Sequence, residues 1–279
     1  MRPIVPFNIV RGVLACLVAQ MVGATLPVRA AEGPFDSFHL GIEVGPVWLG
    51  QNDGRYGAQG TAYSARTVGQ DQTLFLSQRL TGEARWGDVH RLILLVAPLD
   101  VTTRTRLDRD LRFRDTLFPA GTVVDSRYLF DGFRLSYLRE VQRWDGGAWE
   151  VGASAQIRNA EVSFAEVAGS RYEAERDIGF VPILKTRWRQ QLPTGGTFVF
   201  DLDALGAAGV PQFQGGILDG AASVHLPITR DLETFLRLRY LTGGATVPAR
   251  DIQNWGQYLT LATGLVMNWG KSGTSEGGW

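Results

Sequence analysis

Large apolar residues alternate with small or polar ones through the stretch from Tyr258 to Trp269. One side of this stretch carries the larger apolar side chains: Leu259, Leu261, Leu265, Met267 and Trp269. The other side carries small or polar side chains: Thr260, Ala262, Gly264 and Asn268. Because successive side chains of a β-strand point to opposite faces, this period of two predicts a strand with one face against an apolar medium. The aromatic residue at its end suits the boundary between a membrane and water.

Nine further segments have strand patterning, which predicts about ten strands, a number within the range of bacterial barrels. They lie near residues 38–48, 74–86, 93–104, 133–137, 149–158, 180–189, 198–204, 222–226 and 233–240. In the third segment, Ile93, Leu95 and Val101 are assigned to the outward apolar face, with Asp100 on the opposite face. Pro182 interrupts the sixth segment, where a paired strand loses one ladder hydrogen bond.

The connections between these segments alternate in length. Long ones near residues 51–72, 105–125, 159–177 and 242–257 follow odd-numbered segments, with a shorter one near 210–215. Short turns near residues 87–88, 143–147, 193–196 and 229–231 follow even-numbered segments. Barrels of the outer membrane have short periplasmic turns and longer external loops, so the alternation favours a membrane barrel over a soluble one.

The closing stretch resembles the last strand of Gram-negative outer-membrane β-barrels. In these proteins the terminal glycine, the alternating apolar residues and the final aromatic are recognised by the barrel assembly machinery. The resemblance is to the superfamily, without a specific family. The expected fold is all-β: a closed antiparallel up-and-down transmembrane β-barrel of about ten strands, within a range of roughly 8–12. The resemblance also implies contact with outer-membrane lipid and lipopolysaccharide. A monomer is expected.

The first 30 residues have the pattern of a signal peptide. Arg2 and Arg11 precede an apolar run over residues 12–26, and Val28 and Ala30 offer small residues before a cleavage at Ala31. The expected organisation is a signal peptide at 1–30, a barrel domain at 31–271 and a C-terminal tail at 272–279.

Removal of the signal peptide changes both the cysteine content and the charge. Cys16 is the only cysteine, and a lipoprotein role for it is the alternative to loss with the signal peptide. A mature chain without cysteine has no disulfide to stabilise it. Loss of Arg2, Arg11 and Arg29 changes 28 basic against 28 acidic residues to 25 against 28, a net charge of −3. This balance gives no indication of nucleic-acid binding.

The faces opposite the apolar ones carry charges of both signs. The residues expected to form a polar network in the lumen are Glu43, Arg79, Glu83, Arg85, Arg134, Glu150, Arg158, Lys185, Asp201, Asp203, Arg237 and Arg239. Long charged side chains fill a barrel of this strand number and bind one another, so the lumen is expected to be mostly closed. A narrow channel for small solutes is the alternative.

Two features were weighed as signs of catalysis or metal binding. Asp201 and Asp203 project to the same side of a strand about 6–7 Å apart, a separation that could hold a water for acid–base chemistry. The competing interpretation, that they balance arginines in the lumen, is favoured. His39, His90 and His225 are the only histidines and do not have ligand spacing. No metal, no cofactor and no enzymatic activity are expected.

The third segment and the loop after it are rich in arginine. The five residues are Arg104, Arg106, Arg109, Arg112 and Arg114, interleaved with Asp108, Asp110 and Asp115. Guanidinium groups bind phosphate well, so these arginines are candidate contacts to lipopolysaccharide. A solvated loop whose charges pair with one another is the alternative. In the external loops, Tyr56, Tyr63 and Trp255 are candidates for a ligand or adhesion surface, and a place in the aromatic belt at the membrane boundary is the alternative.

The sequence therefore predicts an integral outer-membrane β-barrel with a structural or surface-interaction role. Three alternatives remain open at this point: a narrow channel, a soluble exported β-barrel that binds a small ligand, and an outer-membrane enzyme that modifies lipid or peptide. The soluble alternative inverts the barrel, with the apolar faces inside and the charged faces in water.

Overall fold

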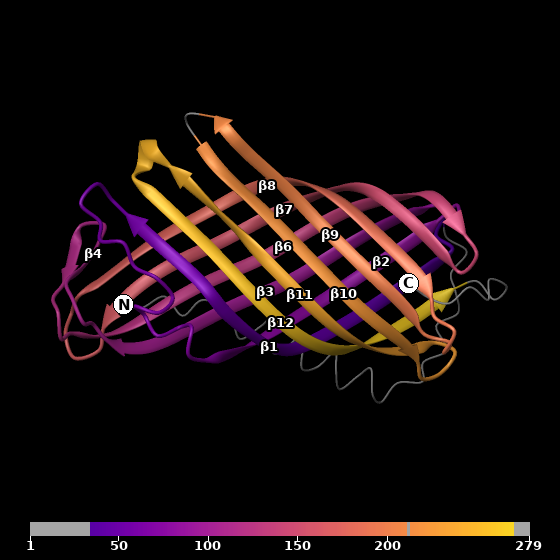
Figure 1. Ribbon diagram of the computed structural model, residues 1–279, viewed down its shortest axis with the longest axis horizontal. Coiled ribbons are helices and arrows are strands. Elements are labelled where there is room, and N and C mark those ends of the chain that lie inside the picture. Colours follow the sequence, from indigo (N-terminus) through magenta and orange to yellow (C-terminus); the bar gives the residue numbers. More distant parts are fainter. Residues whose placement is uncertain (1–33, 211–212, 271–279) are drawn as a thin grey trace.

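Ten long strands form a closed antiparallel barrel in a computed structural model that describes residues 34–210 and 213–270 (Figure 1). Around the barrel the neighbours run β1, β12, β11, β10, β9, β8, β7, β6, β3 and β2. Their bounds are β1 (Ser37–Tyr56), β2 (Leu74–Trp86), β3 (His90–Arg106), β6 (Val123–Trp144), β7 (Gly147–Glu166), β8 (Tyr172–Gln191), β9 (Thr197–Val210), β10 (Phe213–Pro227), β11 (Leu232–Val247) and β12 (Ile252–Gly270).

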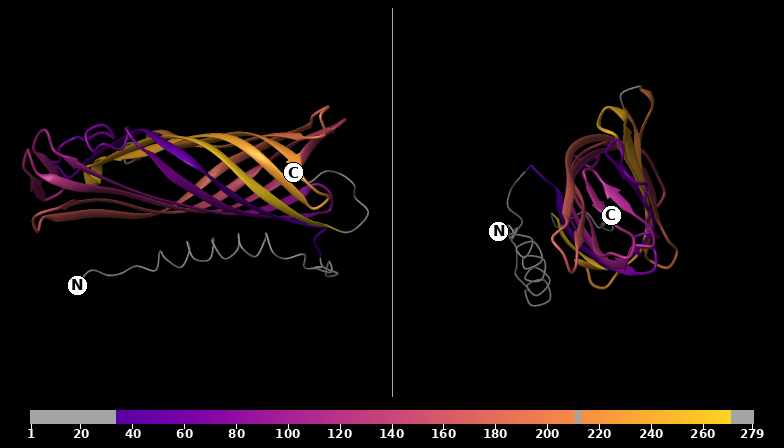
Figure 2. Two further views of the ribbon diagram at one scale, coloured as in Figure 1. Left: turned by 90° about the horizontal axis from the view of Figure 1, so that it is seen from below. Right: turned by 90° about the vertical axis from the view of Figure 1, so that its left-hand side faces the viewer.

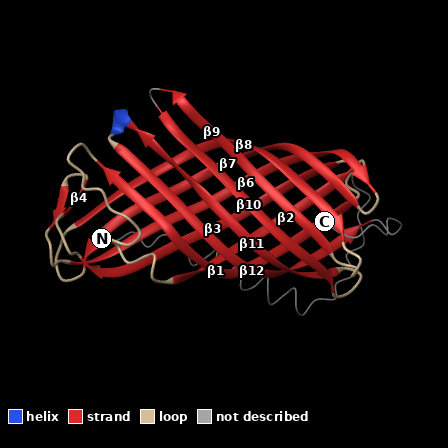
Figure 3. Cartoon of the chain, in the orientation of Figure 1, coloured by secondary structure: helices blue, strands red, loops and turns tan. Residues whose placement is uncertain are grey.

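Three short elements lie at the end of the barrel that carries the long loops. They are β4 (Leu111–Phe113) and β5 (Thr116–Phe118), which pair with each other, and the 3-10 turn η1 (Pro248–Arg250) (Figure 3). No helix among the described residues is long and apolar enough to cross a membrane.

The barrel closes through its first and last strands. β1 pairs with β12 from Ser37 opposite Gly270 to Tyr56 opposite Ile252, with a register shift after Leu49. This is the architecture of an outer-membrane β-barrel, and the predicted fold class and superfamily resemblance are confirmed. The described barrel lies within the expected domain at 31–271, whereas the expected signal peptide at 1–30 and tail at 272–279 lie outside the described residues.

The outer face of the barrel is apolar and the inner face is charged. Leu184 is 67% exposed and Phe180 is 68% exposed on the outer face of β8, whereas Lys185 and Arg187 on the other face of the same strand are buried in the lumen. A soluble barrel requires the opposite arrangement. An apolar belt over all ten strands, with every strand paired around the ring, is the form in which β-structure crosses a membrane. The protein therefore spans the outer membrane.

The predicted outward face of the third segment is wrong. Ile93, Leu95 and Val101 are buried in the lumen, and Leu92 and Leu94 are exposed on the outside. A shift of one residue moves every side chain of a strand to the other face. Both faces of this segment are apolar at its start, so the alternation does not show which residues face outward.

Several strands are longer than predicted, and two predicted loops are therefore wrong in length. β7 and β8 leave only residues 167–171 between them, and β11 and β12 leave only 248–251. A strand needs about 9–11 residues to cross the hydrocarbon. These strands continue past the apolar belt, and there their outward residues are polar. The polar composition of these parts is that of loops, so they were predicted as loops.

The orientation follows from the connections. The turns at residues 87–89, 145–146, 192–196 and 228–231 are all short, whereas the opposite end carries the two longest connections, at 57–73 and 107–122. We call the end with the four short turns the short-turn end and the opposite end the external end, because outer-membrane barrels place short turns in the periplasm and long loops outside.

An arginine on the outer face should destabilise the barrel according to its depth. Leu261 is 50% exposed near the middle of the apolar run on β12, and Leu261→Arg is expected to cost about 2–4 kcal/mol. Gln257→Arg, on the same face nearer the external end, is expected to cost about 0–1 kcal/mol. Urea unfolding of protein refolded into lipid vesicles measures both. Equal midpoints for the two variants would contradict the assigned position of the membrane.

A glycine of the closing strand packs too closely for any side chain. A Cβ at Gly264 would lie 2.0 Å from the carbonyl oxygen of Ile42 and 2.5 Å from the ring of Phe235. Gly264→Ala is expected to cost about 1–3 kcal/mol, because the neighbouring backbone must shift. Gly82→Ala is the matched control, since a Cβ there has no atom within 4 Å. Unfolding in urea should separate the two variants, and similar midpoints would show that the barrel relaxes at Gly264.

Candidate functional site

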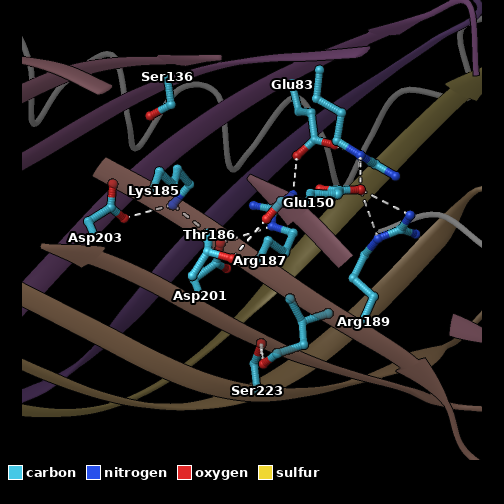
Figure 4. Close-up of polar contacts among 12 residues, drawn as sticks. Glu83, Ser136, Glu150, Lys185, Thr186, Arg187, Arg189, Asp201, Asp203 and Ser223 are labelled. Atoms are coloured by element: carbon cyan, nitrogen blue, oxygen red, sulfur yellow. Dashed lines mark hydrogen bonds and ion pairs between the residues drawn. The ribbon is translucent and has the colours of Figure 1, made fainter. Parts of the chain in front are cut away.

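Charged side chains fill the half of the lumen nearer the short turns. Inward residues two apart on β8 form a row, and β9 places a carboxylate opposite each of two of them: Lys185 faces Asp203, and Arg187 faces Asp201. The Arg187 Nε donates to Asp201 Oδ1 at 2.9 Å, and the Lys185 Nζ donates to Asp203 Oδ2 at 2.7 Å (Figure 4). The register of two neighbouring strands thus sets these pairs.

A second set of ion pairs crosses the lumen from wall to wall. The Arg187 Nη1 on β8 donates to Glu83 Oε2 on β2 at 2.8 Å. Glu83 also accepts from Arg91 on β3, and the Arg91 Nε donates to Glu150 Oε1 on β7 at 2.6 Å. All four side chains are almost completely buried. The bore is therefore bridged at this level by charged groups that satisfy one another.

A third set lies beside these pairs. The Arg239 guanidinium donates to both oxygens of Asp219 at 2.7 and 2.9 Å, and Arg134 lies 3.0 Å from Asp219 and from Asp203. Arg237 donates to Glu43 at 2.5 Å. The space left among these groups is about 60 Å³, enough for only a few water molecules.

Ten of the twelve residues predicted for the lumen lie in this network. They are Glu43, Arg79, Glu83, Arg134, Glu150, Lys185, Asp201, Asp203, Arg237 and Arg239. The other two lie elsewhere: Arg85 donates to the carbonyl oxygen of Asp88 in the first short turn, and Arg158 lies in the external half, paired with Asp177.

Four members of the network are absent from the predicted set: Arg91, Arg187, Arg189 and Asp219. Arg91 was missed because the two faces of its strand were assigned the wrong way round. It faces the lumen, whereas Leu92 and Leu94 face outward. Asp219 lies in β10 before the point at which that strand was expected to begin. Arg187 and Arg189, which binds Glu150 at 3.0 Å, lie within the sixth segment but were not assigned to the network.

The residues weighed for catalysis or metal binding all have structural contacts. Asp201 and Asp203 bind Arg187, Lys185 and Arg134, which is the charge-balancing arrangement. Within residues 34–210 and 213–270, no group of three His, Cys, Asp or Glu side chains is placed to hold a metal ion.

The three histidines have separate contacts. His39 Nδ1 lies 2.6 Å from Asn268 Oδ1, the His225 ring stacks on Phe235, and His90 on the outer face lies 2.7 Å from the Tyr137 hydroxyl.

An apolar plug occupies much of the external half of the lumen. The loop at 57–73 and the segment at 107–122, which contains the β4–β5 hairpin, fold into the barrel mouth (Figure 2). Their apolar residues pack against inward residues of β1, β3, β6, β7, β11 and β12. The plug residues in this cluster are Tyr63, Val68, Leu107, Leu111, Phe113 and Phe118.

Tyr63 shows how this plug differs from the sequence-based expectation. Its backbone exchanges two hydrogen bonds with Gly54, at 2.9 and 3.0 Å, and its ring packs against Phe164. Burial raises the pKa of the Tyr63 phenol well above its ordinary value, so the group is neutral. Tyr63 and Tyr56, which were candidates for a ligand or adhesion surface or for the aromatic belt, are core residues in the structure.

Beside the plug is a cavity of about 360 Å³, lined by β6 to β12. Most of its wall is apolar or glycine, including Phe130, Ile217 and Leu241. Its charged lining includes a group of arginines and carboxylates from β7, β8 and η1. A second space of about 290 Å³ shares part of this charged group and lies between the cavity and the loop segment at 114–115.

Four of the five external arginines bind groups of this chain through their side chains. Arg104 binds both oxygens of Asp125, at 2.8 and 2.9 Å. Arg106 and Arg109 donate to the carbonyl oxygens of Gly121 and Ala62, and Arg114 pairs with Glu175. For Arg112 the backbone N–H donates to Thr61 Oγ1. Arg104, Arg106 and Arg109 remain exposed.

No family model and no curated protein sequence matches the chain. Solved structures with a similar fold include the translocator domain of the autotransporter NalP from Neisseria meningitidis, with 10% identity over 92% of this chain and 97% of that chain and a TM-score of 0.40. The outer membrane protease OmpT from Escherichia coli has 10% identity over 86% and 99%, with a TM-score of 0.39. Ail, the attachment invasion locus protein of Yersinia pestis, has 7% identity over 82% and 99%, with a TM-score of 0.38. Likenesses at this level carry no argument about activity, ligand or partner.

Proposed function

We propose that the protein is a non-conducting, non-enzymatic outer-membrane barrel that acts through its external surface, with lipopolysaccharide as a partner. The observation that carries the first part is the closure of the bore at two levels. Ion pairs bridge the lumen in the short-turn half, and the apolar plug fills the mouth beside the cavity. A hydrated ion would have to separate buried ion pairs in order to pass, which is strongly unfavourable.

Planar-bilayer recording tests the closure directly. Full-length protein inserted into bilayers is expected to give no conductance steps, while a porin inserted under the same conditions gives them. Insertion is verified independently by heat-dependent migration of the protein recovered from the bilayer lipid. Reproducible single-channel steps from inserted protein would overturn the closed-bore proposal and favour the narrow channel.

The proposed lipopolysaccharide contact is supported by exposed arginines at the external end. Arg104, Arg106 and Arg109 lie there with solvent-accessible guanidinium groups, and such groups bind phosphate through paired hydrogen bonds. The triple change of these residues to Gln is expected to weaken binding of purified lipopolysaccharide by roughly tenfold or more, since a charge-assisted hydrogen bond contributes about 1.5–3 kcal/mol.

The matched control carries the same change at three exposed arginines near the short turns, Arg139, Arg143 and Arg230. It removes the same charge from the other end of the barrel, so its affinity should stay at the wild-type value. Equal loss of affinity in both triple variants would show that only net charge matters, and no loss in either would remove lipopolysaccharide as a partner of these arginines.

A further inference from the structure

The ladder between β8 and β9 stops part-way up the barrel wall. Among the described residues, β8–β9 pairs run from Gln191 opposite Thr197 to Leu184 opposite Ala204 and go no further. Both strands continue beyond that point: β8 pairs with β7 as far as Tyr172, and β9 continues to Val210 beside β10. The external ends of β9 and β10 rise above the barrel outline at the top of Figure 1. The wall therefore has a lateral opening above the Leu184–Ala204 pair.

This opening reaches the level of the membrane. Phe180 projects from the unpaired part of β8 on the outer face, and Ile157 faces it from β7. Both are exposed apolar residues of the outer belt. The lower part of the opening thus faces hydrocarbon on the external side of the membrane.

The 360 Å³ cavity lies directly behind the opening. Leu205 on β9 faces the lumen, as its neighbours Asp203 and Ile217 do, yet it is 37% exposed. Phe180 faces outward, yet it lines the same cavity. A single space that touches an inward residue of β9 and an outward residue of β8 passes between the two strands.

An opening of this kind requires a physical reason. An unpaired backbone N–H or C=O facing hydrocarbon costs several kcal/mol, so lipid-exposed strand edges are avoided. Pro182 lies two residues past the last paired residue of β8 and has no N–H to donate. The edges are tolerable where the space behind them supplies water or a bound molecule.

The cavity has an apolar body and a charged end. Around the end, Arg250 donates to Glu175 at 2.7 Å and lies 3.5 Å from Asp177. Arg158 also pairs with Asp177, and Arg114 with Glu175. Two arginines, Arg158 and Arg250, line this end together with three carboxylates, those of Glu161, Glu175 and Asp177. It therefore offers both donors and acceptors to a polar head group. The volume falls within the range of small-molecule sites.

We propose that this cavity binds a single-chain amphiphile with a polar head group, which enters from the outer leaflet through the opening between β8 and β9. The acyl chain lies against Leu205, Ile217 and Leu241, and the head group binds the charged side chains at the other end, Arg158 among them. The proposal is independent of whether the barrel conducts ions or binds lipopolysaccharide.

Binding of dansyl-undecanoic acid to the full chain in lipid vesicles tests the site. Leu205→Trp fills the cavity and is expected to weaken binding at least tenfold. Leu202→Trp, the same change on the outer face of β9, should leave the affinity unchanged. Arg158→Gln should weaken binding of the acid several-fold and leave that of its uncharged methyl ester unchanged. Unaltered affinity of the acid in Leu205→Trp would overturn the site. Equal effects of Arg158→Gln on acid and ester would overturn the contact between the head group and the charged end.

The entry route is tested by closing the opening. Continuation of the register would place residue 182 opposite residue 206, so Pro182→Cys/Gly206→Cys is oxidised to join the strands and reduced as its own control. Cross-linking should slow binding of probe supplied in the bilayer by tenfold or more, and reduction should restore the rate. If the cross-link does not form, Gly206→Trp places a bulky side chain at the same point. An unchanged rate from the bilayer in the closed variant, or faster binding from water than from the bilayer, would overturn lateral entry.

Discussion

Replacing Arg187 with methionine is expected to destabilise the folded barrel by about 3–5 kcal/mol. The guanidinium joins two carboxylates, Glu83 at 2.8 Å on the far wall and Asp201 at 2.9 Å on the neighbouring strand. Both pairs lie in the interior, where a charge that loses its partner is not solvated by bulk water. After the change Asp201 keeps Lys185 at 3.3 Å, and Glu83 keeps Arg91. Each carboxylate then has one cation in place of two.

Arg104→Met is the matched control. Arg104 likewise donates two hydrogen bonds to carboxylate oxygens, in this case both of Asp125, at 2.8 and 2.9 Å. Its side chain, however, is 63% exposed. Solvent screens such a pair, so the expected loss is below about 1 kcal/mol. Urea unfolding of both proteins in lipid vesicles gives the comparison. If the two variants unfold at the same midpoint, the network in the lumen contributes no more to stability than a surface ion pair.

Much of the fold could be predicted because one face of nearly every strand is apolar. The row Leu236 to Tyr240 on β11 alternates strictly, and Leu259 to Trp269 on β12 does so except at Thr263 and Val266. The faces of both strands were assigned correctly. The faces of β3 were assigned wrongly because Leu92 and Ile93 are both apolar and because Asp100, which was assigned to the lumen, lies on the outer face beside Arg127. Where the residues facing the membrane and those facing the lumen are both apolar, the sequence pattern does not distinguish the two faces of the strand.

The site was less accessible to sequence reasoning than the fold. Alternation places Arg187 and Glu83 in the lumen, but these residues are 104 positions apart, and no local pattern gives the register that brings them together. Pro182 was identified as unsuited to a paired strand, and it lies beside the opening between β8 and β9. That residue was the sequence signal for the opening, although a proline alone does not show which ladder is interrupted.

The plug was missed because the loop that forms it was judged by its charges. Phe113 and Phe118 lie among the arginines and aspartates of residues 104–115 and just after them, and the polar residues dominate the average. In the structure Phe113 is only 1% exposed. Its ring centroid lies 4.8 Å from that of Tyr56 and 5.0 Å from that of Phe164, so it joins the hairpin to two strands of the wall.

Phe113→Ala is therefore expected to release the hairpin while the barrel stays folded. Truncating a buried phenylalanine costs about 3–5 kcal/mol. The strands of the wall are hydrogen-bonded to one another, whereas β5 is the only strand among the described residues that pairs with β4. The loss consequently falls on docking of the plug. Because 1.4 kcal/mol corresponds to a tenfold change in an equilibrium, tryptic cleavage at the arginines of residues 106–114 should become about 10²–10³-fold faster or more.

Leu117→Ala separates this docking effect from a general weakening of the loop. Leu117 lies in β5 of the same hairpin but is 37% exposed, so cleavage is expected to change less than about tenfold, as for most surface substitutions. Cleavage tracks the population of the open form when opening and closing are fast relative to proteolysis. Heat-dependent migration on gels should stay at the wild-type value for both variants, because the wall is intact. Equal cleavage rates in Phe113→Ala and Leu117→Ala would mean that the aromatic cluster does not hold the plug. Loss of heat-dependent migration in Phe113→Ala would mean instead that plug and wall fold as one unit.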